Sequence, residues 1–141
     1  MRILLLFSIF VLIQPSASAQ NNSTYSLIIV ANTDDVHLTF TQREVRNLFM
    51  GRVSKIQLEP VALPPESPIR VLFNTKVVGL TEARIQSYWA QMRFSGRNRP
   101  PRELSDVEAV LRFIQQHKNT VAYLPAGIEI PQELTVIYRS N

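Results

Sequence analysis

The sequence lacks the residues on which several classes of protein chemistry depend. It has no cysteine, which excludes disulfides, thiolate metal ligands and cysteine nucleophiles. It also has no Walker loop, no glycine-rich dinucleotide fingerprint and no nucleophile elbow. His37 and His117 stand alone, and the carboxylates of Asp34 and Asp35 lie in a polar turn where such groups are usually solvated. We therefore expect no catalytic residue, no metal site and no cofactor.

The longest apolar run is at the N-terminus and has the form of a secretory signal peptide. Arg2 supplies positive charge, residues 3–13 form an almost unbroken apolar run, and residues 17–19 are the small residues that a signal peptidase reads. The run is about half as long as the ~20 residues that a membrane-spanning helix needs. We predict that residues 1–19 are a cleaved signal peptide. Residues 20–141 would then form one domain, exported to the periplasm without stable membrane insertion.

Positive charge is the next feature of the sequence. The formal charge of the full chain is +4, and loss of Arg2 with the signal peptide leaves 4 − 1 = +3. Arg93, Arg97, Arg99 and Arg102 fall in one short stretch that contains no acidic residue. Such a patch suits nucleic acid, an anionic membrane surface or an anionic ligand. Export makes nucleic acid the weakest of these, so we expect no nucleic-acid partner.

The hydrophobic pattern predicts four strands and four helices. The strands are expected at residues 25–31, 57–63, 120–124 and 134–138, and the helices are expected to begin near Thr41, Ser67, Thr81 and Ser105. The helical spacing predicts a common core of Val45, Leu48, Phe49, Leu72, Phe73, Val110, Leu111 and Ile114. The order is strand, helix, strand, three helices, strand, strand. This order predicts an α/β domain of three layers, with a mixed sheet flanked by helices.

Capping signals mark where the helices begin. Thr41 with Glu44, and Ser105 with Glu108, have the spacing of capping boxes. Ser67 is expected to be the N-cap of the second helix, because Pro68 suits the first helical position.

Two places in the sequence are candidates for anion binding. The helix after Ser67 presents unpaired N–H groups and the positive end of its dipole, and Arg70 follows one turn later. In the loop at 97–102, Arg97, Arg99 and Arg102, held by two prolines, form a stiff basic edge suited to an anion or an acidic partner. In the simpler interpretation, Ser67 only caps its helix and the loop arginines are only solvated. The predicted ligand-binding residues are Ser67, Arg70, Arg97 and Arg99.

Four segments together resemble a known family. They are HLTFTQREVRNLFMGRVSK (37–55), PPESPIRVLF (64–73), YWAQMRFSGRNRPP (88–101) and NTVAYLPAG (119–127). Their order resembles that of periplasmic phosphate-binding proteins, in particular short, single-lobe relatives of the substrate-binding proteins of phosphate ABC transporters. In that family a Ser-Gly-Thr turn follows the second strand and contacts phosphate.

The resemblance implies a fold and a function. The fold would be one lobe of a type 2 periplasmic binding protein. The function would be that of an exported, non-catalytic, solute-binding-like domain that binds phosphate or another small anion as an accessory to transport or sensing. Of the family's ligand residues only Ser67 matches, since Leu63 and Pro65 replace an arginine and an aspartate. The alternative is a protein interaction module with a degenerate ligand site, docking on an envelope complex.

Overall fold

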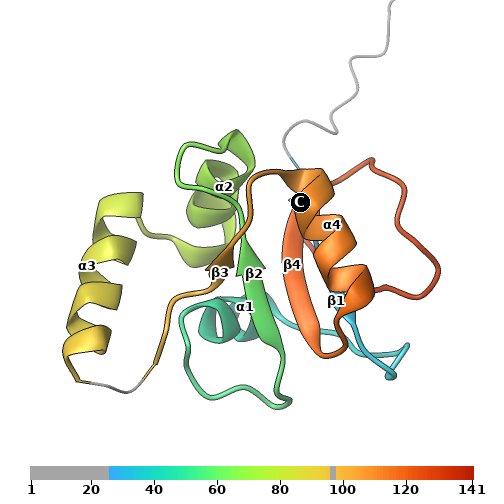
Figure 1. Ribbon diagram of the computed structural model, residues 1–141, viewed down its shortest axis with the longest axis horizontal. Coiled ribbons are helices and arrows are strands. Elements are labelled where there is room, and N and C mark those ends of the chain that lie inside the picture. Colours follow the sequence, from blue (N-terminus) through green and yellow to red (C-terminus); the bar gives the residue numbers. More distant parts are fainter. Residues whose placement is uncertain (1–25, 96–97) are drawn as a thin grey trace, which may run out of the picture.

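The computed structural model describes residues 26–95 and 98–141, so the predicted signal peptide and Arg97 lie outside the described residues. Figure 1 shows the elements in chain order. The strands are β1 (Leu27–Asn32), β2 (Glu59–Ala62), β3 (Arg102–Glu103), β4 (Thr120–Pro125) and β5 (Thr135–Arg139). The helices are α1 (Gln42–Phe49), α2 (Pro68–Phe73), a π-helical turn η2 (Asn74–Val78), α3 (Glu82–Phe94) and α4 (Val107–Gln116). The predicted order of elements is confirmed, with β3 and η2 as additions.

The strands form one mixed sheet in the order β3-β2-β4-β1-β5. β1 is antiparallel to both of its neighbours, β4 and β5, whereas β2 is parallel to β4 and β3. Every residue of β1 is buried, as expected for a central strand covered on both faces. The predicted mixed sheet is therefore confirmed.

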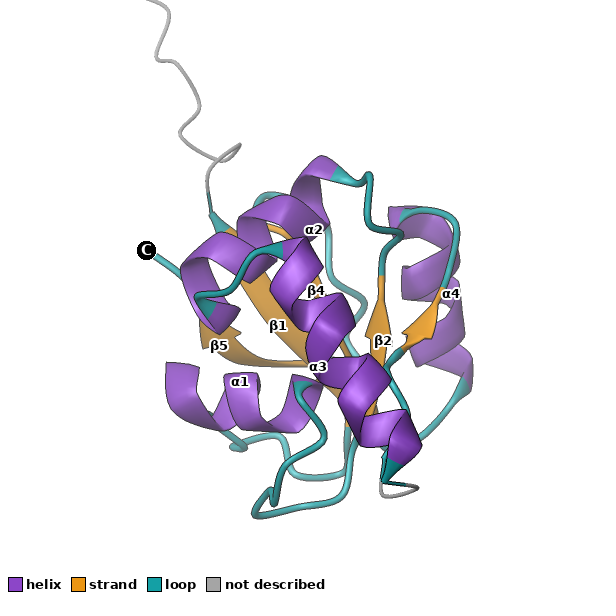
Figure 2. Ribbon diagram, turned by 90° about the vertical axis from the view of Figure 1, so that its left-hand side faces the viewer, coloured by secondary structure: helices purple, strands orange, loops and turns teal. Residues whose placement is uncertain are grey.

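Helices cover both faces of this sheet and one of its edges. Figure 2 shows α1 and α2 on one side of the strands and α4 on the other, and η2 contacts both α1 and α2. The covering helices contact the same central strands, because α2 and α4 both pack on β1 and β4. Beyond the edge strand β3 lies α3, which buries Ile85 and Trp89. The domain thus has the predicted three layers, and α3 forms an additional wall at the β3 edge.

The core is built largely from the predicted residues. Val45, Leu48, Phe49, Phe73, Val110 and Ile114 are buried as expected, whereas Leu72 and Leu111 are only partly buried against the core. Phe73 stacks on Tyr123 with ring centroids 4.1 Å apart, and Phe49 lies 4.8 Å from Phe73. These three rings join α1, α2 and β4 at the centre of the domain.

One predicted capping box is confirmed and the other is wrong. The Thr41 hydroxyl accepts a hydrogen bond from the Glu44 amide, and the Glu44 carboxylate accepts one from the Thr41 amide at 2.6 Å. In α4 the N-cap is Asp106 and not Ser105, since the Asp106 carboxylate accepts from the Ala109 amide at 2.8 Å. A carboxylate is the stronger acceptor at the positive end of a helix.

Two short elements depart from the expected pattern. β3 has two residues and pairs with β2, where the sequence predicts a loop. The strand was not predicted because two residues are too few to show an alternating pattern. The helix that begins at Pro68 widens into η2 before Gly79 ends it with a φ of 71°. Among residues 26–95 and 98–141, no helix has the length and apolar character needed to cross a membrane.

Candidate functional site

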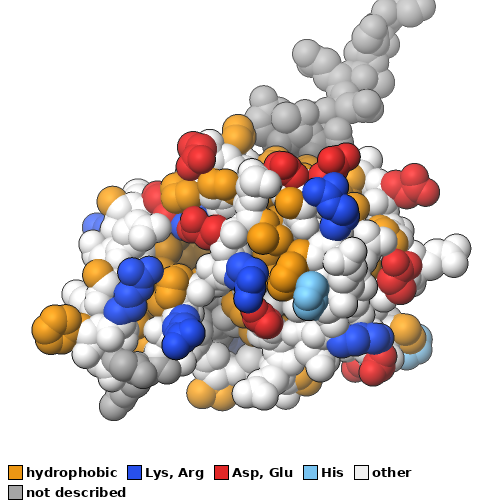
Figure 3. Space-filling model, in the orientation of Figure 1, with side chains coloured by type: hydrophobic (Ala, Val, Ile, Leu, Met, Phe, Trp, Pro, Cys, Tyr) orange, Lys and Arg blue, Asp and Glu red, His pale blue; other side chains and the backbone are white. Residues whose placement is uncertain are grey.

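Two surface pockets flank Phe49 and Trp89, which line both of them. The first pocket, with a volume of about 420 Å³, lies between α3 and the sheet edge and contains Arg70; we name it the Arg70 pocket. The second, also of about 420 Å³, lies between the loop after α1, α3 and residues 98–99; we name it the Arg99 pocket. Figure 3 shows the hollowed surface between α3 and the sheet. Each pocket contains one of the arginines predicted from the sequence.

Arg70 is buried and already has protein partners. Its Nε and Nη2 donate to the two oxygens of Glu82 at 2.9 and 2.6 Å. Its Nη1 donates to Glu103 at 2.6 Å and to the carbonyl oxygen of Leu63 at 2.7 Å. A guanidinium has five N–H groups, so these four bonds leave one for any other acceptor.

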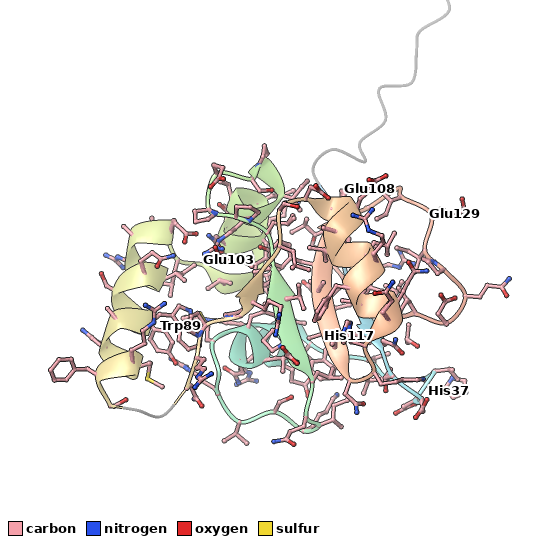
Figure 4. All side chains as sticks on the ribbon, viewed as in Figure 1. His37, Trp89, Glu103, Glu108, His117 and Glu129 are labelled. Carbon is pink, nitrogen blue, oxygen red and sulfur yellow. The ribbon has the colours of Figure 1, made fainter. Side chains whose placement is uncertain are left out.

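The partners of Arg70 come from three separate parts of the chain. Glu82 is the first residue of α3, Glu103 belongs to β3, and Leu63 follows β2. Figure 4 shows Glu103 on β3, close to α2. Asn74 and Gln86 donate further hydrogen bonds to Glu82, at 2.8 and 2.6 Å. The guanidinium therefore ties α2, α3 and β3 together.

The ion pairs determine how Arg70 and Glu82 titrate. Burial acts to raise the pKa of the Glu82 carboxyl, but hydrogen bonds from Arg70 and Gln86 outweigh it and hold this pKa below its ordinary value. Burial likewise opposes the charged form of Arg70, but the hydrogen bonds to Glu82 and Glu103 leave its pKa raised. One guanidinium and two carboxylates sum to 1 − 2 = −1, so the cluster does not attract anions.

Ser67 lies at the N-terminus of α2 but does not cap it with its side chain. It has the extended backbone of an N-cap residue, yet its hydroxyl makes no capping hydrogen bond. Pro68 occupies the first helical position and removes one backbone N–H, and α2 itself has six residues. The binding of an anion by Ser67 and Arg70 stays a prediction, and the local charges and donors do not favour it.

The Arg99 pocket has the opposite electrostatic character. Arg52 and Arg99 line it, and no Asp or Glu does so among the described residues. In the described parts of the chain neither arginine takes part in an ion pair. The hydroxyl of Ser54, another lining residue, is buried and has no hydrogen-bond partner among the described residues. Positive charge and one unpaired polar group thus meet at this pocket.

Gly51 shapes the back of the Arg99 pocket. Its φ of 66° is in the left-handed region that glycine adopts readily. A Cβ at this position would lie 2.9 Å from Cη2 of Trp89, so a side chain would collide with α3. The Asn98 side-chain amide donates to the Gly51 carbonyl oxygen, which holds residues 98–99 against this turn.

The structure only partly brings together the predicted basic edge. Arg97 is outside the described residues. Arg102 pairs with Glu59 at 3.7 Å and lies 5.2 Å from the centre of the Phe113 ring. Arg93 and Arg99 are exposed, and Figure 3 shows Lys and Arg side chains near the lower end of α3.

Sequence reasoning missed four residues of these two pockets. They are Glu82, Glu103, Arg52 and Ser54. Of these four, only Arg52 and Ser54 could have been found from the sequence. They closely follow Gly51, a glycine that ends the helix whose apolar face contains Phe49. The described residues also hold no group of three His, Cys, Asp or Glu side chains placed to bind a metal ion.

Comparison with known proteins shows which solved structures have a similar fold. No protein-family model and no curated protein matches the sequence. The structure is similar to an ABC-type phosphate transport receptor from Vibrio cholerae, with a TM-score of 0.58 and 14% identity. It is also similar to a putative phosphate ABC transporter substrate-binding protein from Clostridium perfringens, solved with bound phosphate, with a TM-score of 0.60 and 9% identity.

This chain has the fold of one lobe of such a receptor. The matches cover 79% of this chain but only 45% and 44% of the two solved chains, so it spans less than half of their length. The fold expected from the family resemblance is therefore confirmed. At these identities the likeness concerns the fold alone.

Proposed function

We propose that this chain is an exported, non-catalytic, solute-binding-like domain that binds a small anion as an accessory to transport or sensing. The observation that carries the proposal is the Arg99 pocket, where Arg52 and Arg99 meet without a carboxylate in the described lining. The receptor-lobe fold supports the same function, because both similar structures are described as phosphate transport proteins.

The electrostatics explain why an anion is the expected ligand. A concave surface lined by charge of one sign concentrates ions of the opposite sign. Arginine offers paired N–H donors that match the geometry of carboxylate and phosphate. In the Arg70 pocket, Glu82 and Glu103 occupy Arg70, and their two charges balance those of Arg70 and Arg93. The Arg99 pocket has no carboxylate in its described lining and is therefore the better candidate.

Thermal unfolding of the chain 20–141 with phosphate tests the proposal. Sodium chloride at the same ionic strength is the control, because salt alone screens surface charges. Phosphate at one hundred times its dissociation constant should add about 2.7 kcal/mol to the free energy of unfolding. This corresponds to a shift of several degrees for a domain of this size. No shift with millimolar phosphate or with any other anion tested would contradict the proposal.

Export is a separate part of the proposal and has its own test. Expressed from its full-length gene in a Gram-negative host, the chain should appear in the periplasmic fraction with Gln20 as its first residue. N-terminal sequencing and fractionation measure both properties. An uncleaved chain in the membrane fraction would contradict this part.

Docking on an envelope complex is the second candidate function, and one exposed side chain favours it. Phe94 at the end of α3 is 98% exposed, next to the exposed Arg93. A photo-crosslinking residue at position 94 should then give a discrete adduct in cells. Val36, which is 68% exposed in the turn after β1, is the control position. An adduct from position 94 alone, with no anion shift in vitro, would favour docking over anion binding.

A further inference from the structure

The lining of the Arg99 pocket is amphipathic as well as basic. Its apolar side chains include Phe49 of α1 and Trp89 of α3, which are each 3% exposed, and Val53, which is 95% exposed and supplies most of the apolar surface of these three. Its positive charge comes from Arg52 and Arg99. These two kinds of surface meet in one pocket.

We propose that the Arg99 pocket binds an organic anion with an apolar body rather than a bare inorganic ion. The carboxylate or phosphate group of the ligand pairs with Arg52 and Arg99, and its apolar part covers the exposed side chain of Val53. This inference rests on the proposed function and names the class of ligand.

The size of the pocket supports an organic ligand. About 420 Å³ lies within the range of roughly 300–1,000 Å³ that is usual for small-molecule sites. An inorganic phosphate has five heavy atoms and fills only a small part of this volume. The remaining surface includes the exposed side chain of Val53, and removing this apolar surface from water favours binding.

A second observation at this pocket is the buried hydroxyl of Ser54, one of its lining residues. A buried polar group without a partner is costly, so native structures usually satisfy such groups. Within the described residues Ser54 is the one residue whose buried side-chain oxygen lacks a partner. The proposed ligand places an acceptor oxygen within reach of this hydroxyl, which requires the Ser54 side chain to rotate toward the pocket. A ligand bound between the arginines then satisfies a group that the domain leaves unpaired.

The Arg70 pocket is the natural contrast within the same molecule. It also has apolar walls and two arginines, Arg70 and Arg93, but Glu82 and Glu103 line it as well. Their negative charges repel an anion and occupy the guanidinium. Among the described residues, the two arginines and two carboxylates of the Arg70 pocket leave its lining without net charge, whereas the Arg99 pocket has two arginines and no carboxylate.

The test compares three probes at matched ionic strength: phenyl phosphate, inorganic phosphate and phenol. Titration is followed by thermal shift and by NMR amide signals of the chain 20–141. Phenyl phosphate should bind at least tenfold more tightly than inorganic phosphate, because its ring buries apolar surface. Phenol should bind weakly, since it carries no charge for the arginines.

Three variants locate the site. Arg52→Met and Arg99→Met should each weaken phenyl phosphate binding about tenfold, the loss expected for one charge-assisted hydrogen bond. Arg84→Met is the control, because Arg84 is an exposed arginine of α3 that lines neither pocket. It should bind as tightly as the wild type. Circular dichroism checks that each variant remains folded.

The outcomes separate this inference from the proposed function. Anion binding that is unchanged by Arg52→Met and Arg99→Met would overturn the inference and leave the proposed function standing. Equal affinity for phenyl phosphate and inorganic phosphate would overturn the proposal that the ligand is an organic anion. If none of the anions binds, the proposed function fails as well.

Discussion

Arg70 and Arg99 are the same residue type in pockets of equal volume, and they have opposite surroundings. Arg70 is 7% exposed and donates four hydrogen bonds, three of them to carboxylates. Arg99 is exposed and has no ion pair within the described residues. A buried arginine with matched carboxylates organises the fold, whereas an exposed one without a carboxylate partner remains available for recognition.

The largest effect is expected where the two regions share a wall. Phe49 lines both pockets and packs on Phe73 and Tyr123. Phe49→Ala should lower the free energy of unfolding by about 3–5 kcal/mol, since it removes a buried ring and leaves a cavity. Urea unfolding measures the loss. A loss below about 1 kcal/mol would mean that the α1 face is not the shared wall.

The next prediction separates the two arginines directly. Arg70→Met should cost about 3 kcal/mol of stability, because it strands Glu82 and Glu103 without their buried partner. The matched substitution Arg99→Met should change stability by less than about 0.5 kcal/mol, as surface substitutions usually do. Urea unfolding of the two variants side by side tests this contrast. Similar losses of stability in both variants would contradict the different structural roles assigned to Arg70 and Arg99.

The pH dependence of stability tests the same cluster in the wild-type chain. The pKa of Glu82 lies below its ordinary value of 4.5, so ionised Glu82 stabilises the fold above that pH. This contribution is lost as the pH falls through the folded-state pKa. Glu82→Gln should therefore differ most from the wild type near pH 7, and the difference should shrink below about pH 4.5. Thermal unfolding of both chains from pH 7 to pH 3 measures it, and a constant difference would contradict the role of the charge.

Patterns that repeat along the sequence predicted most of the fold. The apolar spacing of Val45, Leu48 and Phe49 and the capping pair before them located α1. β3 was missed because Arg102 and Glu103 show no pattern of their own and pair with β2 through backbone hydrogen bonds. Local sequence therefore locates long elements and overlooks those that depend on a neighbour.

The candidate site was harder to predict for the same reason. The partners of Arg70 are 12 and 33 residues away, so the charge around it depends on the folded chain. Arg99 was recognised as part of a basic loop, but its pocket also needs Arg52 and Trp89 from two other segments. The sequence shows which arginines exist, and only the packing shows which of them are already paired.

The smallest expected effect on stability concerns the N-termini of α1 and α2, and it tests whether Ser67 caps its helix. Thr41 accepts a hydrogen bond from the Glu44 amide, so Thr41→Ala should cost about 1 kcal/mol. Ser67 also lies at an N-cap, but its hydroxyl makes no capping bond, so Ser67→Ala should cost less than about 0.5 kcal/mol. Urea unfolding resolves this difference when the two variants are measured in parallel. Equal losses would show that the Ser67 hydroxyl caps α2 in solution. A loss of anion binding in Ser67→Ala with unchanged stability would instead make Ser67 a ligand residue and move the site from the Arg99 pocket to α2.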